Sequence, residues 1–148
     1  MSKMQNHTRG IEDRAFYASI LAGSVNDDQI IKESGIFDIL DSHKIKYEYQ
    51  VISSDREPEK LRQYCMENQS KINVAIGIAG GVPNLPVVIK SWLPKTIVIS
   101  VPLWNEIEYT LASLTTPYDI PIIVSGYGTT GLKKAANITK DIFYLIDM

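Results

Sequence analysis

The sequence has few of the residues on which disulfide and metal chemistry depends. Among its 148 residues there are one cysteine, Cys65, and two histidines, His7 and His43. A single cysteine excludes an internal disulfide and fits the reducing cytoplasm, where we expect the protein to be located. Two separated histidines make no zinc-type ligand cluster, so neither a metal nor another cofactor is expected. Because Cys65 shares a predicted helix face with Leu61 and Tyr64, a buried packing thiol is favoured over a nucleophile.

Long apolar runs and a strong charge are also missing. The net charge is −2 and no basic block occurs, so nucleic acid is not expected as a partner. The longest apolar runs are as short as a strand, and residues 1–14 lack the apolar core of a secretory signal, so no membrane contact is expected. The length and the 45% apolar content predict an N-terminal arm over residues 1–15 and one domain over residues 16–148.

Strand-like and helix-like segments alternate along the chain. Strands are predicted at residues 16–22, 45–51, 74–79, 96–103 and 121–124. Helices are predicted at residues 27–42, from Pro58 onwards, through Ile89 and Trp92, around residues 107–114, and near the carboxyl terminus. The buried stripe of the last helix is predicted to consist of Leu132, Ala135, Ala136, Ile142 and Ile146. This alternation with short connections predicts an α/β fold, a parallel sheet with helices on both faces. Ligands of such sheets bind beyond the carboxyl ends of the strands.

The turns after the predicted strands carry the candidate site residues. Residues 23–27 (GSVND) point backbone N–H groups and a hydroxyl at the start of a helix, where an anion is favoured. Residues 53–56 (SSDR) combine a hydroxyl, an acid and an arginine, which suits a phosphate clamp beside a proton-transferring group. The alternative is that these residues only form turns, helix caps and a surface ion pair. Because residues 80–81 (GG) fall on the same edge of the sheet, the two interpretations are evenly matched.

Residues 126–131 (GYGTTG) have the spacing of a dinucleotide-binding loop. A nicotinamide-cofactor site also needs a second strand and an acidic residue further along the chain, and too few residues follow Gly131 to supply them. We therefore expect these glycines to allow close packing, either at a subunit contact or near a ligand.

Six segments carry a resemblance to a known family. They are GSVND (23–27), SSDREP (53–58), AGGVPNLP (79–86), VP (101–102), LASLTTP (111–117) and AA (135–136). In order and spacing they resemble the PurE family, the N5-carboxyaminoimidazole ribonucleotide mutases and aminoimidazole ribonucleotide carboxylases of purine synthesis, over about residues 16–146. The resemblance implies a three-layer flavodoxin-like fold, a small-molecule ribonucleotide and carbon dioxide as partners, and a homo-octamer with sites shared between subunits. Trp92 and Trp104 belong either to that assembly surface or to the ordinary core.

The resemblance also implies roles for individual residues. Ser24 and Arg56 match the positions that bind the phosphate, and Asp27 matches the one that binds the ribose hydroxyls. Gly80 and Gly81 match the glycines that face the base and its carboxylate. The remaining substrate-binding positions are Ser53, which lines the site, Asn26, which stands where a serine is usual, and Leu85 of the Leu-Pro step.

Two departures from the family pattern concern its site histidines. Asp55 stands in place of the catalytic histidine and Asn84 in place of the second one; both are candidate catalytic residues. Val87 also replaces a glycine, and the loop at residues 104–108 is shorter. A free aspartate has a pKa of about 4 and would be ionised at neutral pH. Burial beside the substrate's own carboxylate would raise that pKa, so we expect Asp55 to transfer the proton and activity to peak on the acidic side of neutral.

Two classes of function remain open from the sequence. One is an enzyme that moves or removes a carboxylate on an aminoimidazole-type ribonucleotide. The other is a non-catalytic nucleotide-binding paralogue of the same fold. The protonatable group at Asp55 favours the enzyme, because a protein that only binds nucleotide could carry any residue there.

Overall fold

The computed structural model describes residues 15–146, and its centre is an open sheet of five parallel strands. The strands are β1 (Tyr17–Ala22), β2 (Lys46–Val51), β3 (Val74–Ala79), β4 (Ile97–Pro102) and β5 (Ile123–Val124). Their order across the sheet is β2-β1-β3-β4-β5. This is the flavodoxin-like order, so the predicted fold is confirmed. The arm predicted for residues 1–15 lies, except for its last residue, outside the described residues.

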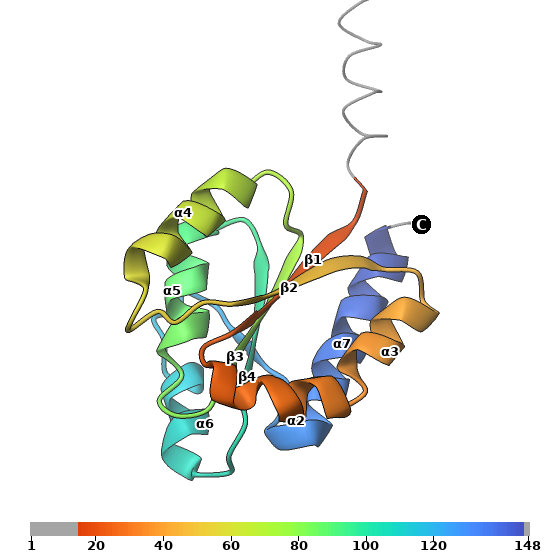
Figure 1. Ribbon diagram of the computed structural model, residues 1–148. Coiled ribbons are helices and arrows are strands. Elements are labelled where there is room, and N and C mark those ends of the chain that lie inside the picture. The colour runs from red at the N-terminus through yellow and green to blue at the C-terminus, as the bar shows by residue number, and fades with distance from the viewer. Residues whose placement is uncertain (1–14, 147–148) are drawn as a thin grey trace, which may run out of the picture.

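Helices cover both faces of the sheet (Figure 1). The helical elements are the 3₁₀ turn η1 (Val25–Asp27) and the helices α2 (Asp28–Glu33), α3 (Ile36–Ser42), α4 (Pro58–Asn68), α5 (Asn84–Trp92), α6 (Ile107–Leu114) and α7 (Gly128–Ile146). α2, α3 and α7 pack on one face, whereas α4 and α5 pack on the other. The three layers follow from this arrangement.

Alternate residues of the strands feed two separate cores. On β1, Ile20 points into the core beneath α7, and its neighbour Leu21 points into the core beneath α4 and α5. β3 is buried along its whole length, as its continuous apolar run predicts. Cys65 is fully buried in the second core, and burial raises the pKa of its thiol to about 11. It is a packing thiol, as expected.

The structure differs from the sequence-based elements in three places. The helix predicted over residues 27–42 is broken at Gly35, which has a left-handed φ of 91°. Strand β2 has no fully solvated face, because the Tyr64 hydroxyl of α4 reaches across to donate to Glu48. Ile146, predicted to be buried, is exposed at the end of α7.

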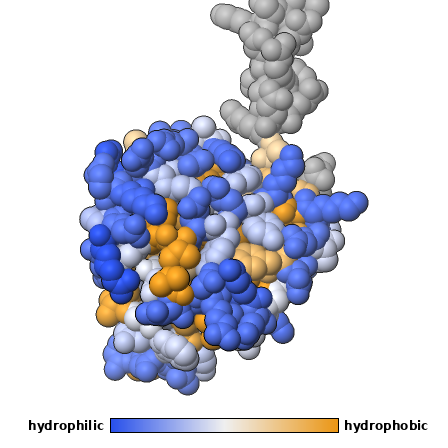
Figure 2. Space-filling model, viewed as in Figure 1, coloured by the Kyte–Doolittle hydropathy of each residue, from blue (hydrophilic) through white to orange (hydrophobic). Residues whose placement is uncertain are grey.

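The face of the molecule shown in Figure 2 is mainly hydrophilic, with small hydrophobic areas between the charged residues. Over residues 15–146, no helix combines the length and the apolar character that crossing a membrane requires.

Candidate functional site

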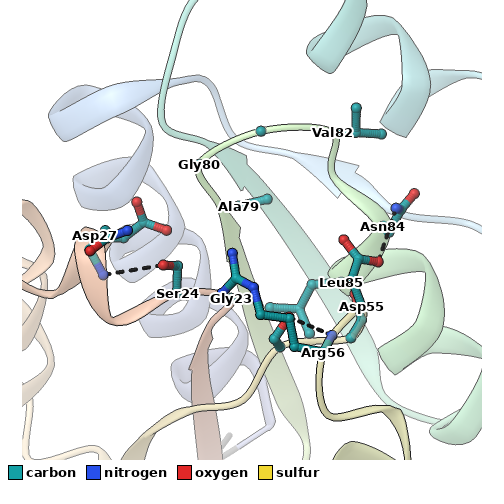
Figure 3. Close-up of a pocket in the computed structure, with 14 residues that line it drawn as sticks. Gly23, Ser24, Asp27, Asp55, Arg56, Ala79, Gly80, Val82, Asn84 and Leu85 are labelled. Carbon is teal, nitrogen blue, oxygen red and sulfur yellow. Dashed lines mark hydrogen bonds between the residues drawn. The ribbon is translucent and has the colours of Figure 1, made fainter.

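A cleft of about 540 Å³ opens beyond the carboxyl ends of β1, β2 and β3 (Figure 3). Its walls are the turns that follow these strands, on the edge of the sheet where ligands of such folds bind. The lining residues are Gly23, Ser24, Asn26, Asp27, Ser53, Ser54, Asp55, Arg56, Ala79, Gly80, Gly81, Val82, Asn84 and Leu85. All ten candidate site residues from the sequence therefore lie around one cleft. The other four lining residues, Gly23, Ser54, Ala79 and Val82, lie in the segments that the sequence pointed to, but no individual role was predicted for them.

The turn after β1 is shaped by backbone hydrogen bonds. The Gly23 N–H donates to the Ile78 carbonyl at 3.0 Å, which continues the pairing of β1 and β3 to the floor of the cleft. Ser24 is extended, and its Oγ accepts from the Asn26 N–H at 3.2 Å, which caps η1. This cap fixes where Asp27, the last residue of η1, enters the cleft.

Asp27 is a buried carboxylate held against a glycine. Its side chain is only 8% exposed, and a Cβ added to Gly80 would lie 2.7 Å from Asp27 Oδ1. Among the described residues, Asp27 Oδ2 has no hydrogen-bond partner. Burial raises the pKa of Asp27, and the nearby charge of Arg56 partly opposes this increase. An unpartnered, desolvated acceptor that lines a cleft is suited to receive hydrogen bonds from a ligand.

The turn after β2 presents a free cation. Ser53 Oγ accepts from the Arg56 N–H at 3.0 Å, and the Ser53 carbonyl accepts from the Glu57 N–H at 2.9 Å. The Arg56 side chain extends across the cleft toward Ser24 and Gly80 (Figure 3). Over residues 15–146 it forms no salt bridge, so its guanidinium is available to an anion. Within this part of the chain, the surface ion pair that the sequence left as an alternative is not formed.

Asp55 and Asn84 meet at the opposite end of the cleft. Asn84 is the first residue of α5, and its Nδ2 donates to Asp55 Oδ1 at 3.3 Å. Asp55 does not cap α4, whose N-cap is Glu57. Both side chains are exposed to the cleft, and Asp55 turns away from the guanidinium of Arg56 (Figure 3). The two candidate catalytic residues thus form one hydrogen-bonded pair.

The glycine-rich segment at residues 126–131 lies outside the cleft lining. Gly126 has a left-handed φ of 132°, and a Cβ on Gly131 would lie 2.4 Å from the Gly126 carbonyl. The Ser125 hydroxyl also donates to the Gly131 carbonyl at 2.8 Å. These glycines allow α7 to begin directly against the end of β5, which is the close packing that was expected of them. In the part of the chain that the structure describes, no group of three His, Cys, Asp or Glu side chains could hold a metal ion.

The fold and the cleft define the class: a flavodoxin-like α/β protein with its cleft where the strand order reverses. Residues 18–146 match the model of the AIR carboxylase family, and the chain belongs to this family of PurE-type enzymes. The predicted family is therefore confirmed.

Relatives and solved structures agree with the family match. The chain is 34% identical over 123 residues to the N5-carboxyaminoimidazole ribonucleotide mutase of Saccharolobus solfataricus, covering 80% of this chain and 75% of the relative. It is 30% identical over 135 residues to the mutase of the same name from Bacillus subtilis, covering 86% and 80%. The fold is similar to that of Treponema denticola PurE, with a TM-score of 0.68, 18% identity and coverage of 88% and 90%.

Proposed function

We propose that this protein moves or removes a carboxylate on an aminoimidazole-type ribonucleotide of purine biosynthesis. The observation that carries the proposal is that three groups line one cleft. They are the free guanidinium of Arg56, the buried carboxylate of Asp27, and the hydrogen-bonded pair of Asp55 and Asn84. The names of the relatives, mutases acting on N5-carboxyaminoimidazole ribonucleotide, support this substrate class.

The ribonucleotide is proposed to lie with its phosphate toward Arg56. The guanidinium can form a forked, charge-assisted pair of hydrogen bonds to phosphate oxygens. The hydroxyls of Ser24 and Ser53 line the same part of the cleft and complete the anion site. Asp27, whose Oδ2 has no partner among the described residues, accepts from the ribose hydroxyls. The heterocycle then extends toward Gly81 and the Asp55–Asn84 pair.

Asp55 is proposed to transfer the proton. When a carboxylate leaves a ring carbon, that carbon takes a proton, the bond to the carboxylate carbon breaks, and carbon dioxide departs while the electron pair returns to the ring. Protonated Asp55 supplies this proton and becomes a carboxylate; addition of carbon dioxide reverses each step. Asn84 holds the carboxyl group through its Nδ2–H and so acts as a positioning residue.

An absorbance assay tests the proposed function. The protein is incubated separately with N5-carboxyaminoimidazole ribonucleotide and with the ring-carboxylated isomer, and the ultraviolet spectrum is followed. We expect conversion of at least one of them faster than in a protein-free control. If both ligands bind and neither is converted, the non-catalytic paralogue replaces the enzyme.

We also propose that the protein is a cytoplasmic homo-octamer. α6 carries an outward apolar stripe of Ile107, Leu111 and Leu114, and Ser113 is the buried residue of the helix. Trp104, which precedes α6 in the chain, is 53% exposed, whereas Trp92 is half-buried in the second core. Several exposed large apolar side chains on one helix are suited to an interface, and closed symmetry limits its growth.

Disruption of the stripe is expected to dissociate the assembly. Leu111→Lys places a charge in the centre of the stripe, so light scattering should show a smaller particle than the wild type. Gln63→Lys, which adds the same charge on the exposed face of α4, should leave the mass unchanged. A monomeric wild type at micromolar concentration would contradict the proposed octamer.

The buried carboxylate is expected to lower the stability of the ligand-free protein. The pKa of Asp27 is raised in the folded state, so ionisation above the unfolded value of about 4 costs stability as pH increases. Asp27→Asn should therefore increase the free energy of unfolding by about 1 kcal/mol near neutral pH, or about 2–4 °C in Tm, and leave it unchanged at lower pH where Asp27 is protonated. Thermal melts at the two pH values measure the difference.

Asp28 supplies the matched control for this prediction. Hydrogen bonds from Tyr49 and Lys32 lower the pKa of Asp28, so its ionised form is stabilised in the folded state. Asp28→Asn should decrease the Tm near neutral pH, the opposite sign from Asp27→Asn. Equal shifts in both variants would show that burial of Asp27 has no particular cost.

A further inference from the structure

We infer that the Asp55–Asn84 pair selects a heterocycle whose substituent is neutral and donates N–H, in preference to one that carries a carboxylate. This inference rests on the proposed function and concerns which form of the aminoimidazole ribonucleotide the cleft binds more tightly. It predicts that the protein binds the decarboxylated ribonucleotide more tightly than the carboxylated one. This difference in binding free energy favours removal of the carboxylate over its addition.

The geometry leaves one acceptor of Asp55 for a ligand. Asn84 donates to Oδ1 at 3.3 Å, which fixes the orientation of the carboxyl group. The other oxygen of Asp55 points toward the space beneath the loop at Gly80 and Val82 (Figure 3). A carboxylate accepts hydrogen bonds and, when ionised, has none to donate. A ligand group that brings an N–H to this oxygen can therefore donate a hydrogen bond to it. A ligand group that brings a second carboxylate cannot, and the two acceptors oppose each other.

The distribution of charge around the cleft points the same way. The charged residues of the lining are Asp27, Asp55 and Arg56. The Arg56 side chain extends toward Ser24 and Gly80 (Figure 3), so its positive charge lies on the side of the cleft where Asp27 packs against Gly80. A 5′-phosphate bound there neutralises the positive charge of Arg56. Nothing positive among the lining residues then faces Asp55, so this end of the cleft is negative and repels an anionic substituent.

A carboxylated ligand can still bind when a proton neutralises one of the two facing carboxyl groups. On loss of carbon dioxide that proton moves to the ring, and Asp55 becomes an anion facing a neutral aminoimidazole. Its free oxygen can then accept from the exocyclic amino group. The bound decarboxylated state is thus stabilised by the same residue that repels the bound carboxylated state, which favours removal of the carboxylate on the protein.

Two isosteric ribonucleotides separate these effects. 5-Aminoimidazole-4-carboxamide ribonucleotide carries a neutral N–H-bearing group where 5-aminoimidazole-4-carboxylate ribonucleotide carries an anion of the same shape. Calorimetric titration of the wild type at low temperature and neutral pH should give about tenfold tighter binding of the carboxamide, because like charges at close range repel. The ultraviolet spectrum after each titration verifies that the carboxylate ligand is intact.

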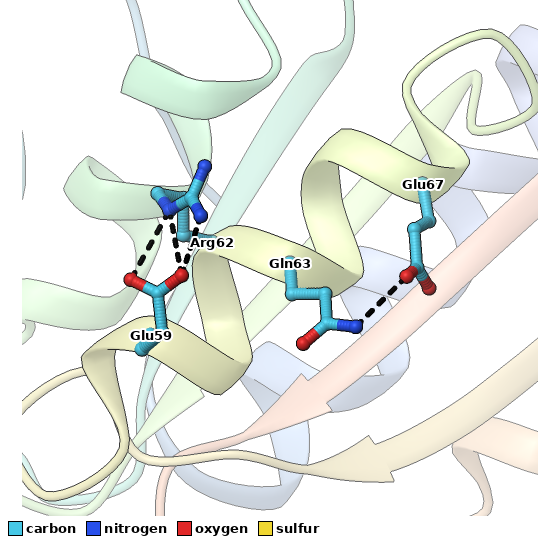
Figure 4. Close-up of polar contacts among 4 residues, drawn as sticks. All are labelled: Glu59, Arg62, Gln63 and Glu67. Carbon is cyan, nitrogen blue, oxygen red and sulfur yellow. Dashed lines mark hydrogen bonds and ion pairs between the residues drawn. The ribbon is translucent and has the colours of Figure 1, made fainter.

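Three variants locate the origin of this preference. Asp55→Asn should reduce the affinity ratio from about tenfold to about one. Asn84→Ala should give an intermediate ratio, since Asp55 keeps its charge and loses its orientation. Glu59→Gln removes one negative charge from the exposed face of α4, outside the cleft, where Glu59 pairs with Arg62 (Figure 4); it should leave the ratio unchanged.

The outcomes distinguish this inference from the proposed function. Equal affinity of the wild type for the two ligands, or an unchanged ratio in Asp55→Asn, overturns the selection by Asp55 and leaves the proposed function standing. Tighter binding of the carboxylate overturns it too. If neither ligand binds and aminoimidazole ribonucleotide itself does not bind, the proposed function and the inference both fail.

Discussion

Asp55→Asn is expected to lower turnover of the carboxylated ribonucleotide by about 10²–10⁴-fold, the usual contribution of a positioned acid or base. Asparagine keeps the shape of aspartate and its hydrogen bonding to Asn84, but it carries no proton that can be transferred to the ring. The variant should still bind the ribonucleotide, because the phosphate and ribose contacts lie at the other end of the cleft. Initial rates from ultraviolet absorbance, together with calorimetric Kd values, separate the two effects.

The control for this variant is Asp141→Asn, which changes an exposed acid on α7 paired with Lys140. It should have wild-type turnover. If Asp55→Asn converts the substrate as fast as the wild type from about pH 5 to about pH 8, Asp55 is not the proton-transferring residue. Asp55 would then have only a structural role, as the acceptor of the hydrogen bond from Asn84.

Arg56→Ala should weaken ribonucleotide binding by about 2–4 kcal/mol, which is roughly 30- to 1,000-fold in Kd. The loss is large because the guanidinium makes no salt bridge in the described residues and is free for the phosphate. Removing it leaves the phosphate opposite hydroxyl groups alone. Calorimetry with aminoimidazole ribonucleotide measures the change.

Two comparisons make the Arg56 result specific. Arg62→Ala removes an arginine from the same stretch of chain, one that already pairs with Glu59 on the outer face of α4 (Figure 4), and should leave Kd unchanged. The corresponding nucleoside, which lacks the phosphate, should bind equally to Arg56→Ala and to the wild type. A nucleoside that also loses affinity would place Arg56 against the base or the ribose and not against the phosphate.

Much of the fold could be predicted from the sequence, because the pattern of apolar residues shows which strands are buried. The uninterrupted apolar run of β3 predicted a strand covered on both faces, and β3 has that position in the sheet. Once the strands are parallel, their following turns must meet at one edge. That geometric necessity is why residues as distant in sequence as Ser24 and Asn84 could be assigned to one cleft.

The features that the sequence did not predict depend on backbone conformation and on contacts between helices and strands. The break at Gly35 follows from a left-handed backbone and from Ser34, whose hydroxyl donates to the Ile31 carbonyl at 2.6 Å and accepts from the Ile36 N–H at 3.2 Å. Helical periodicity runs through this break and does not reveal it. Similarly, the apolar residues of α6 indicated a helix, but only the structure shows that its apolar stripe faces outward.

The close approach of Asp27 and Gly80 constrains how the protein can change during evolution. A side chain at position 80 would collide with the Asp27 carboxylate, whereas a Cβ at neighbouring Gly81 meets nothing within 4 Å. Positions 27 and 80 should therefore show epistasis: alanine at position 80 becomes acceptable only after the side chain at position 27 has become smaller. Libraries that mutate position 80 alone will record it as immutable, and paired substitution of positions 27 and 80 is the route to a different ligand at this end of the cleft.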